Sequence, residues 1–177
     1  MEKIKIIPAN PQNAAKIYSL IDSCRSYLRE WLSWVDLSGS PDDTERYIRE
    51  FIGGDIYTGR MNFEIYFNDE LCGMIDLHNG NEIEKSVEIG YWLGEQFQGK
   101  GIVTEACKQI INLAFAELDV EIIYIKCAEG NLRSRHIPER LGFSISGTEE
   151  KLQLNSNIPH RLIVYKLNKE ELIKPSL

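Results

Sequence analysis

Two glycines flank a lysine just ahead of a helix-like pattern in the segment EQFQGKGIVTEA, residues 95–106. A helix N-terminus carries unpaired backbone N–H groups and about half a positive charge, so it favours bound phosphate. Gly99 and Gly101 would let backbone amides approach an anion because no Cβ stands in the way. The segment has neither Walker A spacing nor G-x-G-x-x-G spacing. It therefore predicts a loop that binds phosphate or pyrophosphate, with a plain strand-to-helix turn as the alternative.

The elements beside this loop can be read from hydrophobic spacing. Residues 106–118 carry apolar side chains at helical intervals, which predicts an amphipathic helix directly after the loop. A strand is expected over 86–93, where Gly90 indicates a bulge or a close backbone approach. Residues 122–125 (IIYI) predict a buried strand, and 131–140 a short helix that ends at Gly142 in a left-handed cap.

The rest of the chain supplies further helices and strands. We expect a first strand at 3–7, a helix entered at Asn10-Pro11, a second helical stretch over 27–35 and a third helix from Asp42. A hairpin follows at 63–67 and 71–77, then a polar loop at 78–81; the tail predicts two antiparallel strands at 143–154 and 161–167. The order β-α-α-α-β-β-β-α-β-α-β-β is a mixed α+β layout.

Composition narrows the function classes. A length of 177 residues favours one domain spanning 1–177, and a net charge of −7 argues against nucleic-acid binding. The acidic surface could attract basic substrates or could serve solubility alone. No signal peptide or membrane span is visible, three histidines lack ligand spacing, so no metal is expected, and no C-x-x-C occurs. These features predict a cytoplasmic protein with reduced cysteines, which are Cys24, Cys72, Cys107 and Cys127.

Four short motifs, in order, resemble the GCN5-related N-acetyltransferase (GNAT) superfamily. They are EIGYWL at 88–93, QGKGIV at 98–103, NLRS at 131–134 and LGF at 141–143. The closer resemblance is to the Rim-type branch, which acetylates serine or alanine N-termini of ribosomal proteins, and it covers nearly the whole chain. It implies a GNAT fold, with a central, mostly antiparallel mixed sheet of about seven strands that is splayed at the acetyl-CoA site.

The resemblance also implies a site for acetyl-CoA as co-substrate. The pantetheine arm would lie along the strand end and reach the NLRS motif, while amides of the glycine loop would hold the pyrophosphate. The family's Q-x-x-G-x-G/A pattern fits in two registers, starting at Gln96 or at Gln98, and we prefer Gln98 although Val103 then replaces a small residue. The expected cofactor-binding residues are Tyr91, Trp92, Leu93, Gln98, Gly99, Lys100, Gly101, Ile102, Val103, Thr104, Asn131 and Ser134.

Attack of an amine on a thioester needs a base for the ammonium and an acid for the leaving thiolate. The resemblance assigns the base to Glu88, whose pKa partial burial would raise, and the acid to Ser134. Pro138 falls near the place where many family members carry a tyrosine acid, so the thiolate could instead leave unassisted. Trp31 and Trp34, on one face of the expected helix, and His160 are candidate acceptor contacts; core packing is the alternative for the tryptophans.

The acceptor is narrowed by amine chemistry. Roughly a tenth of an N-terminal α-amine is neutral at pH 7, against well under about a tenth of a percent of a lysine amine. A single modest base therefore suits the N-terminal α-amine of a ribosomal or other protein. A small-molecule amine acetyltransferase (polyamine, aminoglycoside or amino-acid-like acceptor) and an acyl-CoA-binding sensor without transfer activity remain alternatives. No direct nucleic-acid or membrane partner is expected, and the resemblance makes a homodimer plausible.

Overall fold

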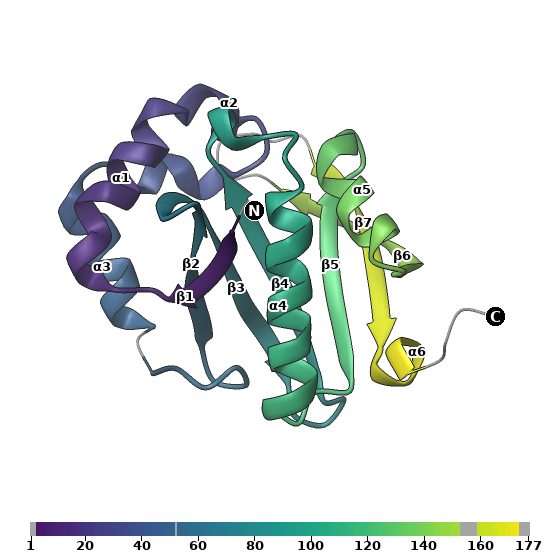
Figure 1. The fold of residues 1–177 in the computed structure, drawn as a ribbon. Helices are drawn as coiled ribbons and strands as arrows, with labels where there is room; N and C mark the ends of the chain where they lie inside the picture. The colour runs from purple at the N-terminus through teal and green to yellow at the C-terminus, as the bar shows by residue number, and fades with distance from the viewer. Residues whose placement is uncertain (1–2, 52, 153–158, 174–177) are drawn as a thin grey trace.

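A single twisted sheet organises the molecule (Figure 1). The computed structural model describes residues 3–51, 53–152 and 159–173, with the backbone alone at 152, 159, 160 and 173. The sheet has seven strands in the order β1-β2-β3-β4-β5-β7-β6. The strands are β1 (Ile4–Pro8), β2 (Arg60–Phe67), β3 (Glu70–Asn81), β4 (Ser86–Leu93), β5 (Ile122–Ala128), β6 (Ser144–Leu152) and β7 (Pro159–Asn168). The predicted α+β class and the mostly antiparallel seven-stranded sheet are confirmed.

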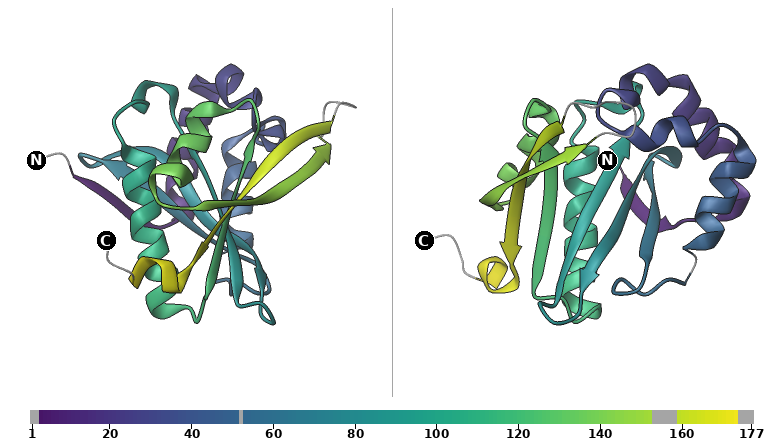
Figure 2. Two further views of the ribbon diagram at one scale, coloured as in Figure 1. Left: turned by 90° about the vertical axis from the view of Figure 1, so that its right-hand side faces the viewer. Right: turned by 180° about the vertical axis from the view of Figure 1, so that it is seen from behind.

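Helices cover the two faces of the sheet unequally. The long helix α4 packs its apolar side against the strands, with Ile110 and Ala114 buried in one core with Leu77, Ile89 and Ile125. The N-terminal helices form a second core with Met74 of β3, toward the opposite face. Seen from behind in Figure 2, that face carries no helix over β4 and β5. The helices are α1 (Ala14–Ser23), α2 (Arg25–Arg29), α3 (Pro41–Glu50), α4 (Ile102–Glu117), α5 (Leu132–Arg140) and α6 (Lys169–Ile173), with 3-10 turns η1 (Pro11–Asn13), η2 (Ser33–Leu37) and η3 (Glu95–Phe97).

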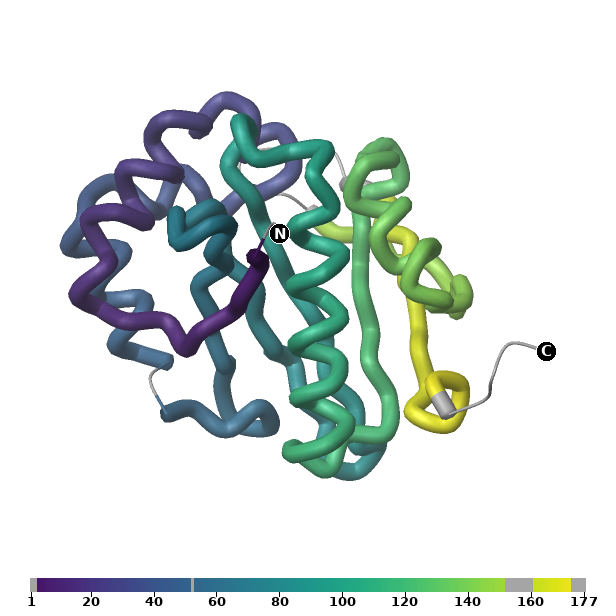
Figure 3. Tube along the Cα trace, in the orientation of Figure 1, coloured from purple at the N-terminus to yellow at the C-terminus, as the bar shows by residue number. Residues whose placement is uncertain are grey.

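The two halves of the sheet meet at β4 and β5, which form its only parallel pair among the described strands. Their register contains four residue pairs, from Ser86↔Ile122 to Ile89↔Ile125. Residues 90–93 of β4 continue to pair with β3, whereas no pairing with β5 is described beyond Ile89. The sheet is therefore splayed at the end where β4 leads into η3 and the glycine loop, as expected (Figure 3). The gap between residues 90–93 of β4 and the end of β5 is called the splay below.

Helix α5 begins and ends with side-chain and backbone caps. The Asn131 side chain accepts the Ser134 N–H at 3.1 Å at its start. At its end, the N–H of Phe143 donates to the Pro138 carbonyl at 3.0 Å and that of Gly142 to the Glu139 carbonyl at 3.3 Å. Gly142 has φ 82°, so the predicted left-handed cap is confirmed and has the hydrogen bonds of a Schellman motif.

Two local predictions were wrong. The single helix expected over 27–35 is instead α2 followed by η2, because Ser33, Trp34 and Val35 are weak helix formers and Arg25 donates to the Val35 and Ser38 carbonyls at 2.6 and 2.9 Å. The expected polar loop at 78–81 belongs to β3. Of the two alternatives given for Gly90, the structure has the close approach, made by side chains of β3, and not the bulge.

In the part of the chain described, no helix is long and apolar enough to cross a membrane.

Candidate active site

The glycine loop turns into α4 with its backbone exposed. Gly99 and Gly101 have φ 75° and 71°, a left-handed conformation that favours glycine. A Cβ built on either residue would meet no other atom within 4 Å, so the space beside the loop is open. Gly101 is the N-cap of α4, and no described side chain caps the helix there. The first-turn N–H groups of a 16-residue helix are thus available to an anion.

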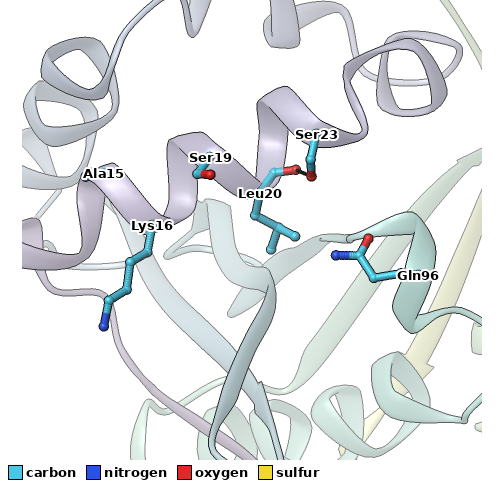
Figure 4. A pocket seen from close by; sticks show the side chains of 6 residues that line it. All are labelled: Ala15, Lys16, Ser19, Leu20, Ser23 and Gln96. Carbon is cyan, nitrogen blue, oxygen red and sulfur yellow. Dashed lines mark hydrogen bonds between the residues drawn. The ribbon is translucent and has the colours of Figure 1, made fainter.

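Gln98 connects this loop to α5. Its Oε1 accepts a hydrogen bond of 2.6 Å from Nη1 of Arg133, while its buried Nε2 has no partner among the described residues. Gln96, which begins the alternative register, points instead into a hollow on the α1 side of η3, and none of the predicted site residues lines that hollow (Figure 4). This contrast favours the register that starts at Gln98. The ammonium of Lys100 lies over the rings of Phe67 and Phe97, at 5.2 and 5.9 Å from their centroids.

The side chain of Tyr91 extends from β4 across the splay and hydrogen-bonds Ser134 in the first turn of α5. The Ser134 hydroxyl donates to Tyr91 Oη at 3.2 Å, and the Tyr91 hydroxyl donates to the Ser134 carbonyl at 3.0 Å. Cys127 Sγ lies 3.2 Å from Ser134 Oγ. Burial raises the pKa of Tyr91 well above its usual value, so the phenol stays protonated. The structure thus brings Ser134, Tyr91 and Cys127 together beside the opening between β4 and β5.

Glu88 lies on the uncovered face, one residue before the last β4–β5 pair. Its Oε1 is 3.4 Å from His78 Nε2, and its Oε2 is 3.2 Å from Asn79 Nδ2 and 3.3 Å from Lys126 Nζ. Burial alone would raise the pKa of Glu88, but His78, Asn79 and Lys126 outweigh it and lower that pKa to about 2. The expected upward shift was wrong, because the sequence did not reveal these three partners.

His78 is held between two carboxylates. Its Nδ1 bonds Asp76 Oδ1 at 2.5 Å while its Nε2 faces Glu88. Burial lowers the pKa of His78, but Asp76 and Glu88 outweigh that effect and raise it to about 9, so the ring is an imidazolium at neutral pH. Gly90 provides the room for this pair, since a Cβ there would lie 3.1 Å from His78 Cε1 and 3.2 Å from the Asp76 oxygens.

Two of the candidate acceptor residues border the splay, although not from one helical face as predicted. Trp34 lies in η2 and packs on Trp92 of β4, with ring centroids 6.1 Å apart. Trp31 lies in the turn after α2, and a Cβ on Gly130 would be 3.5 Å from its Cη2, so this indole packs just beyond β5. His160 lies in strand β7, where the structure describes its backbone and not its side chain.

Comparison with known proteins places the chain in a family. The sequence matches the family model of the acetyltransferase (GNAT) domain over residues 3–144. The chain belongs to the GNAT acetyltransferase family. The Bacillus subtilis protein named "Putative ribosomal N-acetyltransferase YdaF" is 35% identical over 175 residues, which are 96% of this chain and 93% of the relative. The Escherichia coli ribosomal-protein-serine acetyltransferase is 28% identical over 150 residues, or 82% of each chain.

A solved structure supports the fold of this acetyltransferase. The ribosomal L7/L12 alpha-N-protein acetyltransferase RimL, in complex with coenzyme A, superposes with a TM-score of 0.85 over 93% of each chain at 21% identity. The present protein is an acetyl-CoA-dependent N-acetyltransferase of the same fold. Its residues fit the donor: the uncapped start of α4 suits a pyrophosphate, and residues 90–93 leave the backbone edge toward β5 unpaired for a pantetheine amide.

Sequence reasoning missed several residues at this site. The pairing of Asp76 with His78 was overlooked because the predicted strand ended at Leu77, which left His78 in a loop. Carrying the alternation of β3 through to Asn81 would have placed both on one face, opposite Gly90 and Glu88. No comparable signal marks Arg133, Lys126 or the phenol of Tyr91. Their contacts with Gln98, Glu88 and Ser134 join residues more than thirty positions apart in the sequence.

Proposed function

We propose that this acetyltransferase acetylates the N-terminal α-amine of a protein, with a ribosomal protein that begins with serine or alanine as the acceptor, in the cytoplasm. The names of the relatives from B. subtilis and E. coli support a ribosomal acceptor. All four cysteines are free thiols, in keeping with a reducing compartment. On this proposal the whole chain, residues 1–177, acts as one acetyltransferase domain.

The acetyl donor would lie across the splay. Backbone amides at the start of α4 would bind its pyrophosphate, and the β4 edge would pair with its pantetheine amides. The Oδ1 of Asn131 already accepts the Ser134 N–H at the start of α5, so its Nδ2 would be the atom that donates to a pantetheine carbonyl. The residues proposed to hold acetyl-CoA are Tyr91, Trp92, Leu93, Gln98, Gly99, Lys100, Gly101, Ile102, Val103, Thr104, Asn131 and Ser134, with Lys100 contributing its backbone, since its ammonium lies over two aromatic rings.

One observation carries the choice of acceptor, namely the ionised carboxylate of Glu88 next to the point where β4 leaves β5. A carboxyl with a pKa of about 2 attracts an ammonium strongly but removes its proton poorly. Acceptors that are already partly neutral are therefore favoured, and roughly a tenth of an α-amine is neutral at pH 7. The amine nitrogen becomes far more acidic as its bond to the carbonyl carbon forms, and Glu88 then takes the proton.

Ser134 is proposed as the acid that protonates the leaving sulfur. Its hydroxyl now donates to Tyr91 Oη, and rotation about one bond would redirect it into the splay. Trp31 and Trp34 would form the walls of the acceptor entrance, and His160 is proposed as a further acceptor contact. A Ser134→Ala variant should lose on the order of 100-fold in kcat, measured by thiol release at saturating acetyl-CoA.

The test is thiol release from acetyl-CoA with three acceptors in parallel. These are peptides with a free N-terminal serine or alanine, N-terminally blocked peptides that contain lysine, and spermidine. We expect turnover with free N-termini only, and a loss of about 100-fold or more in kcat/KM for Glu88→Gln. Turnover with spermidine alone would assign a small-molecule acceptor, and unchanged activity of Glu88→Gln would remove Glu88 as the base.

A further inference from the structure

Lys126 places its ammonium beside Glu88, the proposed catalytic base. It lies on β5, one residue beyond the last β4–β5 pair, and its side chain is 24% exposed. Its Nζ is 3.3 Å from Glu88 Oε2 and 3.0 Å from Glu149 Oε2. Lys126 therefore has two carboxylate partners, one at the proposed catalytic position and one on the neighbouring hairpin.

The remaining described contacts of the Glu88 carboxylate come from His78 and Asn79 of β3. Its Oε1 faces His78, which is tied to Asp76 behind it, and Asp76 in turn contacts Arg60 of β2 at 3.4 Å. Asn79 donates to Oε2 from β3, so Lys126 occupies the side of Oε2 that faces β5. The gap between β4 and β5 opens on that side, and on the proposed function the acceptor amine approaches from it.

We propose that Lys126 is a specificity-determining residue that occupies the acceptor's ammonium site in the empty enzyme and moves onto Glu149 when the acceptor binds. This inference rests on the proposed role of Glu88. An acceptor ammonium is the same chemical group as the lysine Nζ, so it replaces Lys126 charge for charge. A molecule without an ionisable amine cannot compensate Glu88 in that way and leaves Lys126 in place, whereas an amine acceptor binds as its ammonium and loses the proton afterwards.

Glu149 lowers the free-energy cost of moving the Lys126 ammonium away from Glu88. The Lys126 ammonium keeps a carboxylate partner at 3.0 Å when it leaves Glu88, so no buried charge is left unpaired. The Glu149 side chain is 51% exposed against 15% for Glu88, so solvent screens the attraction of Glu149 for Lys126 more strongly. Glu149 thus sets how readily Lys126 yields the site.

The experiment uses four full-length variants, which are Lys126→Gln, Glu149→Gln, the double variant and the control Lys166→Gln. Lys166 lies opposite Tyr124 in the register of β5 and β7, on the same face of the sheet as Lys126. No described ion pair joins Lys166 to Glu88. With a serine-starting peptide, Lys126→Gln should lower the acceptor KM by about threefold to tenfold, and Glu149→Gln should raise it by a similar factor. The KM for acetyl-CoA should change in neither.

The double variant separates this exchange from a general charge effect. If Glu149 acts through Lys126, adding Glu149→Gln to Lys126→Gln changes nothing, whereas long-range electrostatics alone would make the two effects add. Additive effects, or an equal response of Lys166→Gln, would overturn the proposal.

A second readout does not depend on the acceptor. The ¹³C signal of the Glu88 carboxyl should titrate at higher pH in Lys126→Gln than in Lys166→Gln, and equal titration would also overturn the proposal. If the peptide is not turned over, the four variants are compared with spermidine. A wrong acceptor is then distinguished from a wrong role for Lys126.

Discussion

At the scale of single residues, the charge on Glu88 is fixed by its protein neighbours. His78 has a folded pKa of about 9 against an ordinary 6.5, so its contribution to stability is complete below pH 6.5 and is lost as pH rises through 9. Glu88, at about 2 against 4.5, contributes above pH 4.5 and loses that contribution as pH falls toward 2. The network therefore stabilises the fold most between about pH 4.5 and 6.5.

The pH dependence of unfolding tests this description of His78. In the natural chain, denaturant titrations should show the free energy of unfolding falling by on the order of 3 kcal/mol as pH rises from 6.5 through 9. His78→Gln should remove most of that slope, because the imidazolium no longer bridges Asp76 and Glu88. His136→Gln, at an exposed histidine of α5, is the control; equal slopes in both variants would contradict the pKa assigned to His78.

Gly90 belongs to the same network through its missing Cβ. Gly90→Ala would bring a methyl group to 3.1–3.2 Å from His78 and Asp76, and both are held by their own partners. We expect a loss of about 1 kcal/mol in unfolding free energy and a rise in the pKa of Glu88, measured by chemical denaturation and carboxyl ¹³C titration. Gly147→Ala in β6 should change neither, because its Cβ would meet nothing within 4 Å.

At the scale of elements, the start of α4 depends on a left-handed glycine. Gly101→Ala would strain the backbone by about 1 kcal/mol and shift the amides that face the proposed pyrophosphate. The Kd for acetyl-CoA, measured by calorimetry, should rise at least about fivefold, which corresponds to about 1 kcal/mol.

Gly142→Ala is the matched control for Gly101→Ala. Gly142 has φ 82° and equally open space, but it lies at the far end of α5. The control should lose similar stability while the Kd stays unchanged. Equal donor affinity in the two variants would show that the loop does not bind the donor through its backbone.

Elements with a strong local pattern could be predicted from the sequence. The apolar spacing of α4, the hairpin of β2 and β3, and the cap at Gly142 all depend on residues close together in the chain. The expected helix over 27–35 failed because the tertiary bonds of Arg25 decide where the chain turns. Glu88 could be singled out by its place in a motif, but its pKa depends on His78 and Lys126, which only the folded sheet brings close.

At the scale of the whole molecule, the net charge of −7 should influence encounter with acceptors. Basic peptides are attracted over distances of about 10 Å at 0.1 M salt, and added salt screens that attraction. We expect kcat/KM for a lysine-rich serine-starting peptide to fall several-fold as sodium chloride increases from 0.05 to about 0.3 M. A peptide with the same first residues and no lysine should be much less sensitive, and a parallel decline of both would indicate a salt effect on the enzyme itself.

The four-pair junction of β4 and β5 also bears on how the chain folds. Strands β1 to β4 are all joined through antiparallel neighbours, as are β5, β7 and β6, whereas the parallel junction needs the α4 crossover. Contacts between distant segments form slowly because loop closure costs entropy before they are made. We therefore expect the two halves to dock in the last and slowest folding step. If acetyl-CoA binds across both halves as we propose, it would slow their separation more than it speeds their assembly.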